Sequence, residues 1–185
     1  VRGEVSLAMR LSCFSKFRFV LGVVALCQWL AMPSAWSQTN EYRAFWVDAW
    51  GTGFRSSSEV NTLTNDLRKG KFNTVIPQVR RRGDAFYNSS LGPKNSSVSP
   101  ASFDPLADLI AKCNNTNFGP KIEVHAWIVT YHVWQTNSST PGLPSNPNHP
   151  VNLHPDWLLQ DVNSNIIVGS EYTFDPGHPD VQRHT

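Results

Sequence analysis

NTVIPQVR, residues 73–80, is the stretch that decides the fold of this chain. Most of its side chains are apolar or β-branched, which is typical of a strand buried on both faces of a parallel sheet. Two further short runs, RAFWVDAW at 43–50 and KIEVHAWIV at 121–129, have a similar composition. The sequence therefore predicts three strands in its central part.

The segments between these strands predict two helices. The first follows three serines at 56–58 that can cap a helix, and it ends at Gly70; the second begins at Asp104, an N-cap, with Pro105 in its first position. Their apolar stripes are Val60, Leu63, Thr64 and Leu67 in the first helix and Leu106, Leu109, Ile110 and Cys113 in the second. Strands that alternate with helices in this way imply right-handed βαβ units, and so an α/β fold with a parallel sheet covered by helices.

Residues 1–37 predict a secretory signal peptide that precedes a folded part at 38–185. Basic residues come before an uncharged run at 19–31, and the small-residue pattern AWS follows at 35–37. A membrane anchor is the alternative interpretation, but the run has 13 residues, whereas a membrane span needs roughly 20. We therefore expect cleavage before Gln38 and an exported protein, either secreted or held in the periplasm or cell envelope, with no membrane attachment after cleavage.

Loss of the signal changes the charge balance and the cysteine count. Residues 1–37 carry four of the 16 basic side chains and one of the 14 acidic ones, which leaves 12 and 13 in the remainder. The basic character of the whole chain therefore gives no reason to expect a nucleic acid partner. Cys13 and Cys27 are removed as well, so Cys113 alone remains and no internal disulfide is expected.

Two long connections, 81–102 and 130–156, follow the carboxyl ends of the second and third predicted strands. Loops of this length are usually functional or disordered, and α/β proteins place their binding sites at strand carboxyl ends. Residues 153–174 resemble a small hairpin that turns at 163–165, and Pro179 occupies the start of a further helix.

Polar and aromatic side chains gather where these strands end. Arg80, Arg82 and Asp84 lie at the exit of the second strand, while His125 and Trp127 share one face of the third by the period-two rule. If these faces line the mouth of a barrel, the five side chains converge there. Guanidinium and carboxylate groups fix the positions of hydroxyls, so the cluster predicts a glycan-binding site.

Three more residues are candidates for the same site. Tyr131 and Trp50 offer flat apolar faces for a pyranose ring, and Asp48 is a carboxylate at the end of the first strand. Several less specific interpretations stay open: Asp84 could only cap its own turn, and His125 could be a core histidine. Two neighbours receive structural roles, since Arg81 is expected to be a solvated charge and Glu123 to form an internal ion pair with Arg43.

Neither a metal site nor a cofactor is predicted. His125 and His132 are seven residues apart, and the remaining histidines lie in turns without the spacing of known metal ligands. The sequence also contains no glycine-rich phosphate loop and no G-x-S-x-G nucleophile elbow. These absences favour acid–base chemistry.

Six motifs between Glu41 and about Gln182 occur in a characteristic order. They are EYRAFWVDAWGTGF, GKFNTVIPQVRRRGDAFYNSS, FDPLADLIAKC, IEVHAWIVTYHVW, HPDWL and FDPGHPDVQ. Together they resemble the amino-terminal half of the glycosyl hydrolase-like 10 family, a group of exported barrel-type glycosidases. The resemblance implies a (β/α)8 TIM barrel truncated after about three βα units, since such a barrel takes about 250 residues.

The resemblance also implies a function and a place for the catalytic groups. We expect a fragment of a secreted glycoside hydrolase that acts on O-glycosidic bonds of a polysaccharide or a peptidoglycan-type glycan. In retaining barrel glycosidases the catalytic carboxyl groups come from strands four and seven, so both are expected beyond Thr185, and this part supplies a substrate-binding wall. Asp48 and Asp84 as the catalytic pair, a non-catalytic carbohydrate-binding barrel and a metal-dependent deacetylase are the alternatives.

Overall fold

The computed structural model describes residues 41–135, 142–166 and 170–185. The predicted signal peptide at 1–37 lies outside the described residues, so its assignment stays a prediction. The chain divides into two units, Val1–Glu41 and Tyr42–Thr185, and every helix and strand of the described part belongs to the second.

The predicted parallel sheet is present. Its strands are β1 (Ala44–Val47), β2 (Thr74–Arg80), β3 (Glu123–Val124) and β4 (Trp127–Ile128). The chain direction of β2 is parallel to that of β1 on one edge and to those of β3 and β4 on the other. β2 therefore lies between its neighbours, which explains the nearly continuous burial of its side chains.

Two of the three strands are shorter than the sequence predicts. β1 ends at Val47 because the Asp48 carboxylate accepts hydrogen bonds from the backbone N–H groups of Trp50 and Gly51, at 2.7 and 3.1 Å, and turns the chain out of the sheet. The strand expected at 121–129 is divided into β3 and β4, and the register with β2 shifts between Gln78 and Arg80. An irregularity of this kind re-aims the side chains that follow it.

Both predicted helices are confirmed. In α2 (Ser57–Lys69) the Ser56 hydroxyl accepts a hydrogen bond from the N–H of Glu59, and Gly70 follows the last turn. In α3 (Pro105–Asn114) the Asp104 carboxylate accepts from the N–H of Ala107, and proline occupies the first position. A short 3-10 turn, η1 (Thr116–Phe118), continues from α3.

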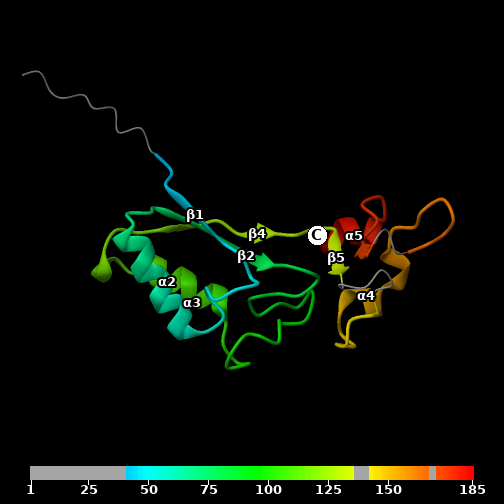
Figure 1. The fold of residues 1–185 in the computed structure, drawn as a ribbon, viewed down its shortest axis with the longest axis horizontal. Coiled ribbons are helices and arrows are strands. Elements are labelled where there is room, and N and C mark those ends of the chain that lie inside the picture. Colours follow the sequence, from blue (N-terminus) through cyan, green and yellow to red (C-terminus); the bar gives the residue numbers. More distant parts are fainter. Residues whose placement is uncertain (1–40, 136–141, 167–169) are drawn as a thin grey trace, which may run out of the picture. The chain divides into compact units, whose positions relative to one another are not determined.

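The two helices lie side by side along the strands (Figure 1). The Arg68 guanidinium of α2 donates to the carbonyls of Lys112 and Asn115 at the end of α3, at 2.8 and 3.1 Å. Between the helices and the sheet lies one hydrophobic core, whose fully buried members include Phe54, Val60, Val75, Phe86, Leu109, Cys113 and Ile122. The predicted stripe of α3 is wrong at Ile110, which is 40% exposed.

A second core forms around an antiparallel pair. β5 (His132–Gln135) pairs with β6 (Glu171–Thr173), and the short helices α4 (Pro150–Leu153), η2 (Pro155–Trp157) and α5 (Pro179–His184) complete this part. Its buried side chains are Val133, Val151, Trp157, Leu158, Tyr172, Phe174 and Val181. The helix that the sequence predicts at Pro179 is therefore confirmed as α5.

The hairpin expected at 153–174 is only partly correct. Its turn exists, because the Asp161 carboxylate accepts from the N–H groups of Asn163 and Asn165, both at 2.8 Å. Among the described residues, its arms meet at their base through a bridge between Leu158 and Phe174 and a hydrogen bond from the N–H of Leu159 to the Thr173 carbonyl. The strand partner of β6 is β5. The sequence did not reveal this pairing, because a strand-like run does not show which of two nearby strands it joins.

The fold is thus mixed α/β with a parallel sheet. Closure into an eight-stranded barrel stays a prediction. In the described part of the chain, no helix has both the length and the apolar character to span a bilayer.

Adjacent residues of α3 test the position of the first core. Leu109→Ala should lower the free energy of unfolding by about 3 kcal/mol, because it leaves a cavity at a fully buried site. Ile110→Ala is the matched control, and as a half-exposed side chain it should cost about 1 kcal/mol or less. Denaturant unfolding of the full chain measures both; equal losses would contradict the orientation of α3.

Candidate functional site

The arginine-rich exit of β2 forms a tight turn. Gly83 has a φ of +73°, a left-handed conformation that favours glycine. The Asp84 carboxylate accepts from the backbone N–H of Arg82 at 3.2 Å, and the chain returns so that the N–H of Phe86 donates to the Val79 carbonyl at 2.9 Å. Asp84 therefore caps its own turn, but this is not its only role, since it also accepts from the Arg81 guanidinium. The turn directs the side chains of residues 81 and 82 toward Trp50.

Two guanidinium groups contact the Trp50 ring. The Cζ atoms of Arg81 and Arg82 lie 3.9 and 4.3 Å from the ring centroid, within the range of cation–π attraction. Trp50 is nevertheless 53% exposed. We call Trp50, Arg81, Arg82, Asp84 and Gln135 the Trp50 cluster.

Arg81 is not the solvated charge that the sequence suggests. Its side chain is 17% exposed, and its guanidinium donates to the Ala49 carbonyl at 2.9 Å and to the Asp84 carboxylate at 3.3 Å. Asp84 also accepts from the side-chain amide of Asn95. These partners compensate the partly buried charge of Arg81, so its side chain is a structural part of the turn after β2.

Arg82 has a different partner from that of Arg81. Its two terminal nitrogens donate to the backbone carbonyl and the side-chain oxygen of Gln135, at 3.0 and 2.8 Å, so the planar fork is held at both tips. Burial and the neighbouring Arg81 lower the pKa of Arg82, while Asp84 and Glu171 oppose this shift. The Arg82 guanidinium therefore links the turn after β2 to the end of β5.

Trp50 itself is positioned by the strands. Asp48 binds the backbone N–H of Trp50, as described above, and the Gln78 side chain of β2 accepts from the N–H of Ala49 at 3.1 Å. The predicted site residues Asp48, Trp50, Arg82 and Asp84 are therefore brought together. Arg80 is separate from them: it is 7% exposed and bonds to a ring nitrogen of His184 at 3.0 Å.

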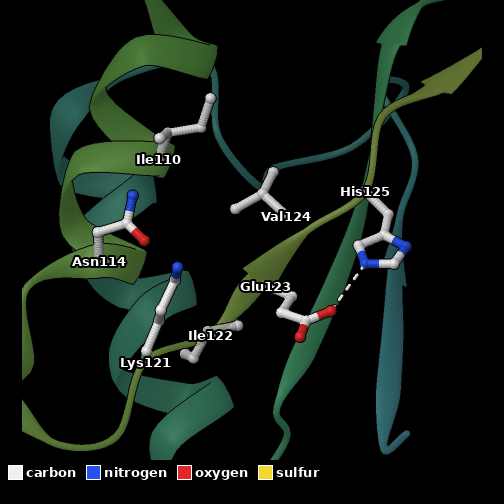
Figure 2. A pocket seen from close by; sticks show the side chains of 7 residues that line it. All are labelled: Ile110, Asn114, Lys121, Ile122, Glu123, Val124 and His125. Carbon is white, nitrogen blue, oxygen red and sulfur yellow. Dashed lines mark hydrogen bonds and ion pairs between the residues drawn. The ribbon is translucent and has the colours of Figure 1, made fainter.

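His125 is separate as well, in a pocket of about 330 Å³ between α3 and β3 (Figure 2). Its side chain is 52% exposed and pairs with the Glu123 carboxylate at 3.0 Å. Two interpretations from the sequence are thereby wrong, because His125 is not a core histidine and Glu123 is as exposed as its partner rather than internal. The pocket is lined by Ile110, Asn114, Lys121, Ile122, Glu123, Val124 and His125, none of which belongs to the Trp50 cluster.

Trp127 takes part in an aromatic surface on the sheet. Its ring stacks on that of Trp46, with centroids 5.8 Å apart and an interplanar angle of 27°. Trp46 is 70% exposed, so the pair presents a flat apolar face. Tyr131 is 38% exposed, and its carbonyl accepts from the N–H of Phe174. Within the described ranges, no three His, Cys, Asp or Glu side chains are grouped as metal ligands would be.

Comparison with known proteins decides the family. The model of the family described as Glycosyl hydrolase-like 10 matches residues 34–185. The chain belongs to this family. Among curated proteins it is similar to "Glycosyl hydrolase YngK" of Bacillus subtilis (strain 168), with 29% identity over 125 residues, which is 65% of this chain. The match covers 22% of the length of that relative.

In this member of the glycosyl hydrolase-like 10 family, several residues at the strand exits contact the predicted site residues. The sequence did not indicate them as part of the site. Arg81, Gln135 and Trp46 contact predicted site residues, and so does His149, whose ring bonds to the Arg82 carbonyl at 2.6 Å. Period-two spacing with Asp48 could have indicated Trp46. Gln135 and His149 lie more than 50 residues from Arg82 in the sequence, and no local pattern connects them.

The role of Asp84 in this family member can be tested by removing its charge. Asp84→Asn should destabilise the chain by about 2 kcal/mol, because it removes the charged acceptor of the half-buried Arg81. Asp66→Asn is the matched control: its ion pair with Lys69 is largely exposed, so the unfolding free energy should hardly change. Chemical denaturation compares the two. An unchanged free energy of unfolding in Asp84→Asn would show that the turn does not depend on this carboxylate.

Proposed function

We propose that this chain is part of an exported glycosidase and that its strand exits form a glycan-binding wall. One observation carries the proposal: a half-exposed indole lies against two guanidinium groups at the carboxyl ends of β1 and β2. Binding sites of α/β proteins lie at this end of the strands. The family and the relative named as a glycosyl hydrolase support a glycosidase-related function.

The chemistry of the Trp50 cluster suits a sugar. Among described residues, protein contacts occupy two of the five N–H groups on each guanidinium, and the Nε of Arg81 is buried without a partner. The remaining terminal N–H groups are the donors that sugar hydroxyls could use. The exposed part of the Trp50 indole supplies apolar contact beside them. The stacked Trp46 and Trp127 rings offer a second flat surface on which a pyranose ring could lie.

The carboxylates of this region favour binding over catalysis. Glycoside hydrolysis needs two carboxyl groups, one to protonate the leaving oxygen and one to attack or to activate water. Asp48 is occupied by two backbone N–H groups, and Asp84 accepts from Arg81, Arg82 and Asn95. We therefore propose that the catalytic pair is supplied from outside the described residues, as the resemblance to retaining barrel glycosidases implies.

Location and substrate follow from the same proposal. The predicted signal at 1–37 would deliver the protein to the periplasm, the cell envelope or the medium, where polysaccharides and peptidoglycan-type glycans are accessible. A closed (β/α)8 barrel would place the two aromatic surfaces on its inner wall and at its mouth. Glycan is the partner we propose.

Arg82→Ala and Trp127→Ala should each weaken glycan binding about tenfold, since each removes a contact worth roughly 1–1.5 kcal/mol. Isothermal titration calorimetry of the full chain with chitohexaose and with soluble peptidoglycan strands measures this effect. Phe118→Ala is the matched control, because Phe118 is an aromatic side chain that is 72% exposed on η1 and should leave affinity unchanged.

Two results would contradict the proposal. Wild-type affinity in both variants would mean that the Trp50 cluster and the stacked Trp46 and Trp127 rings are purely structural. If the protein that includes the proposed catalytic strands binds glycan but releases no reducing ends, the result would instead support the non-catalytic carbohydrate-binding alternative.

A further inference from the structure

His149 is a buried polar residue at the start of α4. Its exposed fraction is 3%, and it is the N-cap of the helix, with proline at the next position. The ring nitrogen Nδ1 accepts a hydrogen bond from the backbone N–H of Val151 at 3.3 Å. An imidazole therefore performs the capping role that serine or aspartate usually has.

This cap determines the tautomer of the ring. Because Nδ1 accepts, the proton of the neutral imidazole is on Nε2. Nε2 lies 2.6 Å from the carbonyl oxygen of Arg82, to which it donates. One ring thus connects the start of α4 to the turn that follows β2.

The same ring also contacts Gly83. A Cβ on residue 83 would lie 2.8 Å from two atoms of the His149 ring, so the ring packs directly on the glycine backbone. Trp134 of β5 makes an edge contact with the imidazole, at 5.5 Å between centroids. The imidazole is therefore confined between β5 and the turn, and has little freedom to move away from Arg82.

Arg82 is held at both ends by a single part of the chain. Gln135, at the end of β5, binds its guanidinium, and His149, fourteen positions later, binds its carbonyl. The His149 contact fixes the backbone from which the Arg82 side chain projects, and the Gln135 contacts fix the position of its guanidinium. The two contacts hold Arg82 while its guanidinium lies against Trp50.

We propose that His149 is a positioning residue of the glycan site: it fixes the Arg82–Gly83 backbone so that the Trp50 cluster is preformed. This inference rests on the proposed function for the role of the cluster. It adds a residue that touches no exposed part of the site and acts through Arg82.

The arrangement has a pH dependence that a passive contact would lack. Asp84 is the charged group of the turn that acts on the ring, Arg82 contacts it through its backbone carbonyl, and Trp134 of β5 is uncharged. Burial lowers the pKa of His149 from its ordinary value of 6.5, although the Arg82 carbonyl and Asp84 oppose this. The second proton would go to Nδ1 and face the Val151 N–H, so the cap of α4 is intact above about pH 6.5 and weakens as the pH falls through the lowered pKa, whereas the Nε2–H contact with the Arg82 carbonyl is kept.

Two substitutions separate the contacts of the ring. His149→Asn keeps an acceptor near the position of Nδ1, and hence the cap of α4, but is too short to reach the Arg82 carbonyl. His149→Gln places an amide N–H near the position of Nε2 and keeps the Arg82 contact, but loses the cap. Neither side chain titrates in this pH range.

We expect His149→Asn to bind chitohexaose or peptidoglycan strands about tenfold more weakly than wild type. Its amides at 81–85 should exchange with deuterium faster, as measured by mass spectrometry on the full chain. His149→Gln should stay within about threefold of wild-type affinity and keep the amides at 81–85 protected. Melting temperatures of both variants report the separate cost of changing the α4 cap.

Each outcome decides the inference. Wild-type exchange at 81–85 in His149→Asn, or equal loosening in both variants, would overturn it. If wild type binds neither glycan probe, the proposed function fails, and the exchange data alone decide whether His149 positions the turn. Loosening in His149→Asn together with protection in His149→Gln would then still support that role.

Discussion

β2 is hydrogen-bonded along both of its edges, and the described structure depends on this constraint. Its neighbours β1 and β3 fix it between Ala44–Val47 and Glu123–Val124, while β4 pairs with its carboxyl-terminal half. A strand that is paired on both sides cannot shift its register without breaking two ladders. The direction in which Arg80, Arg81 and Arg82 leave the sheet is therefore set before any of their side chains makes a contact.

The strand exit after β2 brings adjacent arginines together beside an exposed indole. Adjacent arginines repel each other, and the structure offsets this with the Asp84 carboxylate, the carbonyls of Ala49 and Gln135, and the Trp50 ring. An aliphatic cluster would fill the same space without the desolvation cost of charged groups. Retaining guanidinium groups beside a half-exposed indole is consistent with the proposed recognition of hydroxyl-bearing ligands.

Local patterns were sufficient for most secondary structure. The caps at Ser56 and Asp104 and the helical spacing after them predicted α2 and α3, and Pro179 marked the start of α5. Errors arose where a tertiary contact overrode the pattern. The side chain of Asp48 shortened β1, the register shift divided the third strand, and Ile110 lay beyond the edge of the core that its stripe suggested. For the site, four of the eight predicted residues, Asp48, Trp50, Arg82 and Asp84, belong together, whereas the other four, Arg80, His125, Trp127 and Tyr131, make separate contacts.

The sequence by itself determined the α/β class, the alternation of the first strands and helices, the family and the presence of an arginine-rich strand exit. These properties depend on periodicity, capping and short motifs, which act over a few residues. Tertiary structure alone decided that Arg81 is half-buried on Trp50, that β6 pairs with β5, and that Gln135 and His149 hold Arg82 from both ends. The physical reason is distance along the chain: these contacts join residues that no local spacing relates, and only the packing of β5 and α4 beside the turn brings them within hydrogen-bond reach.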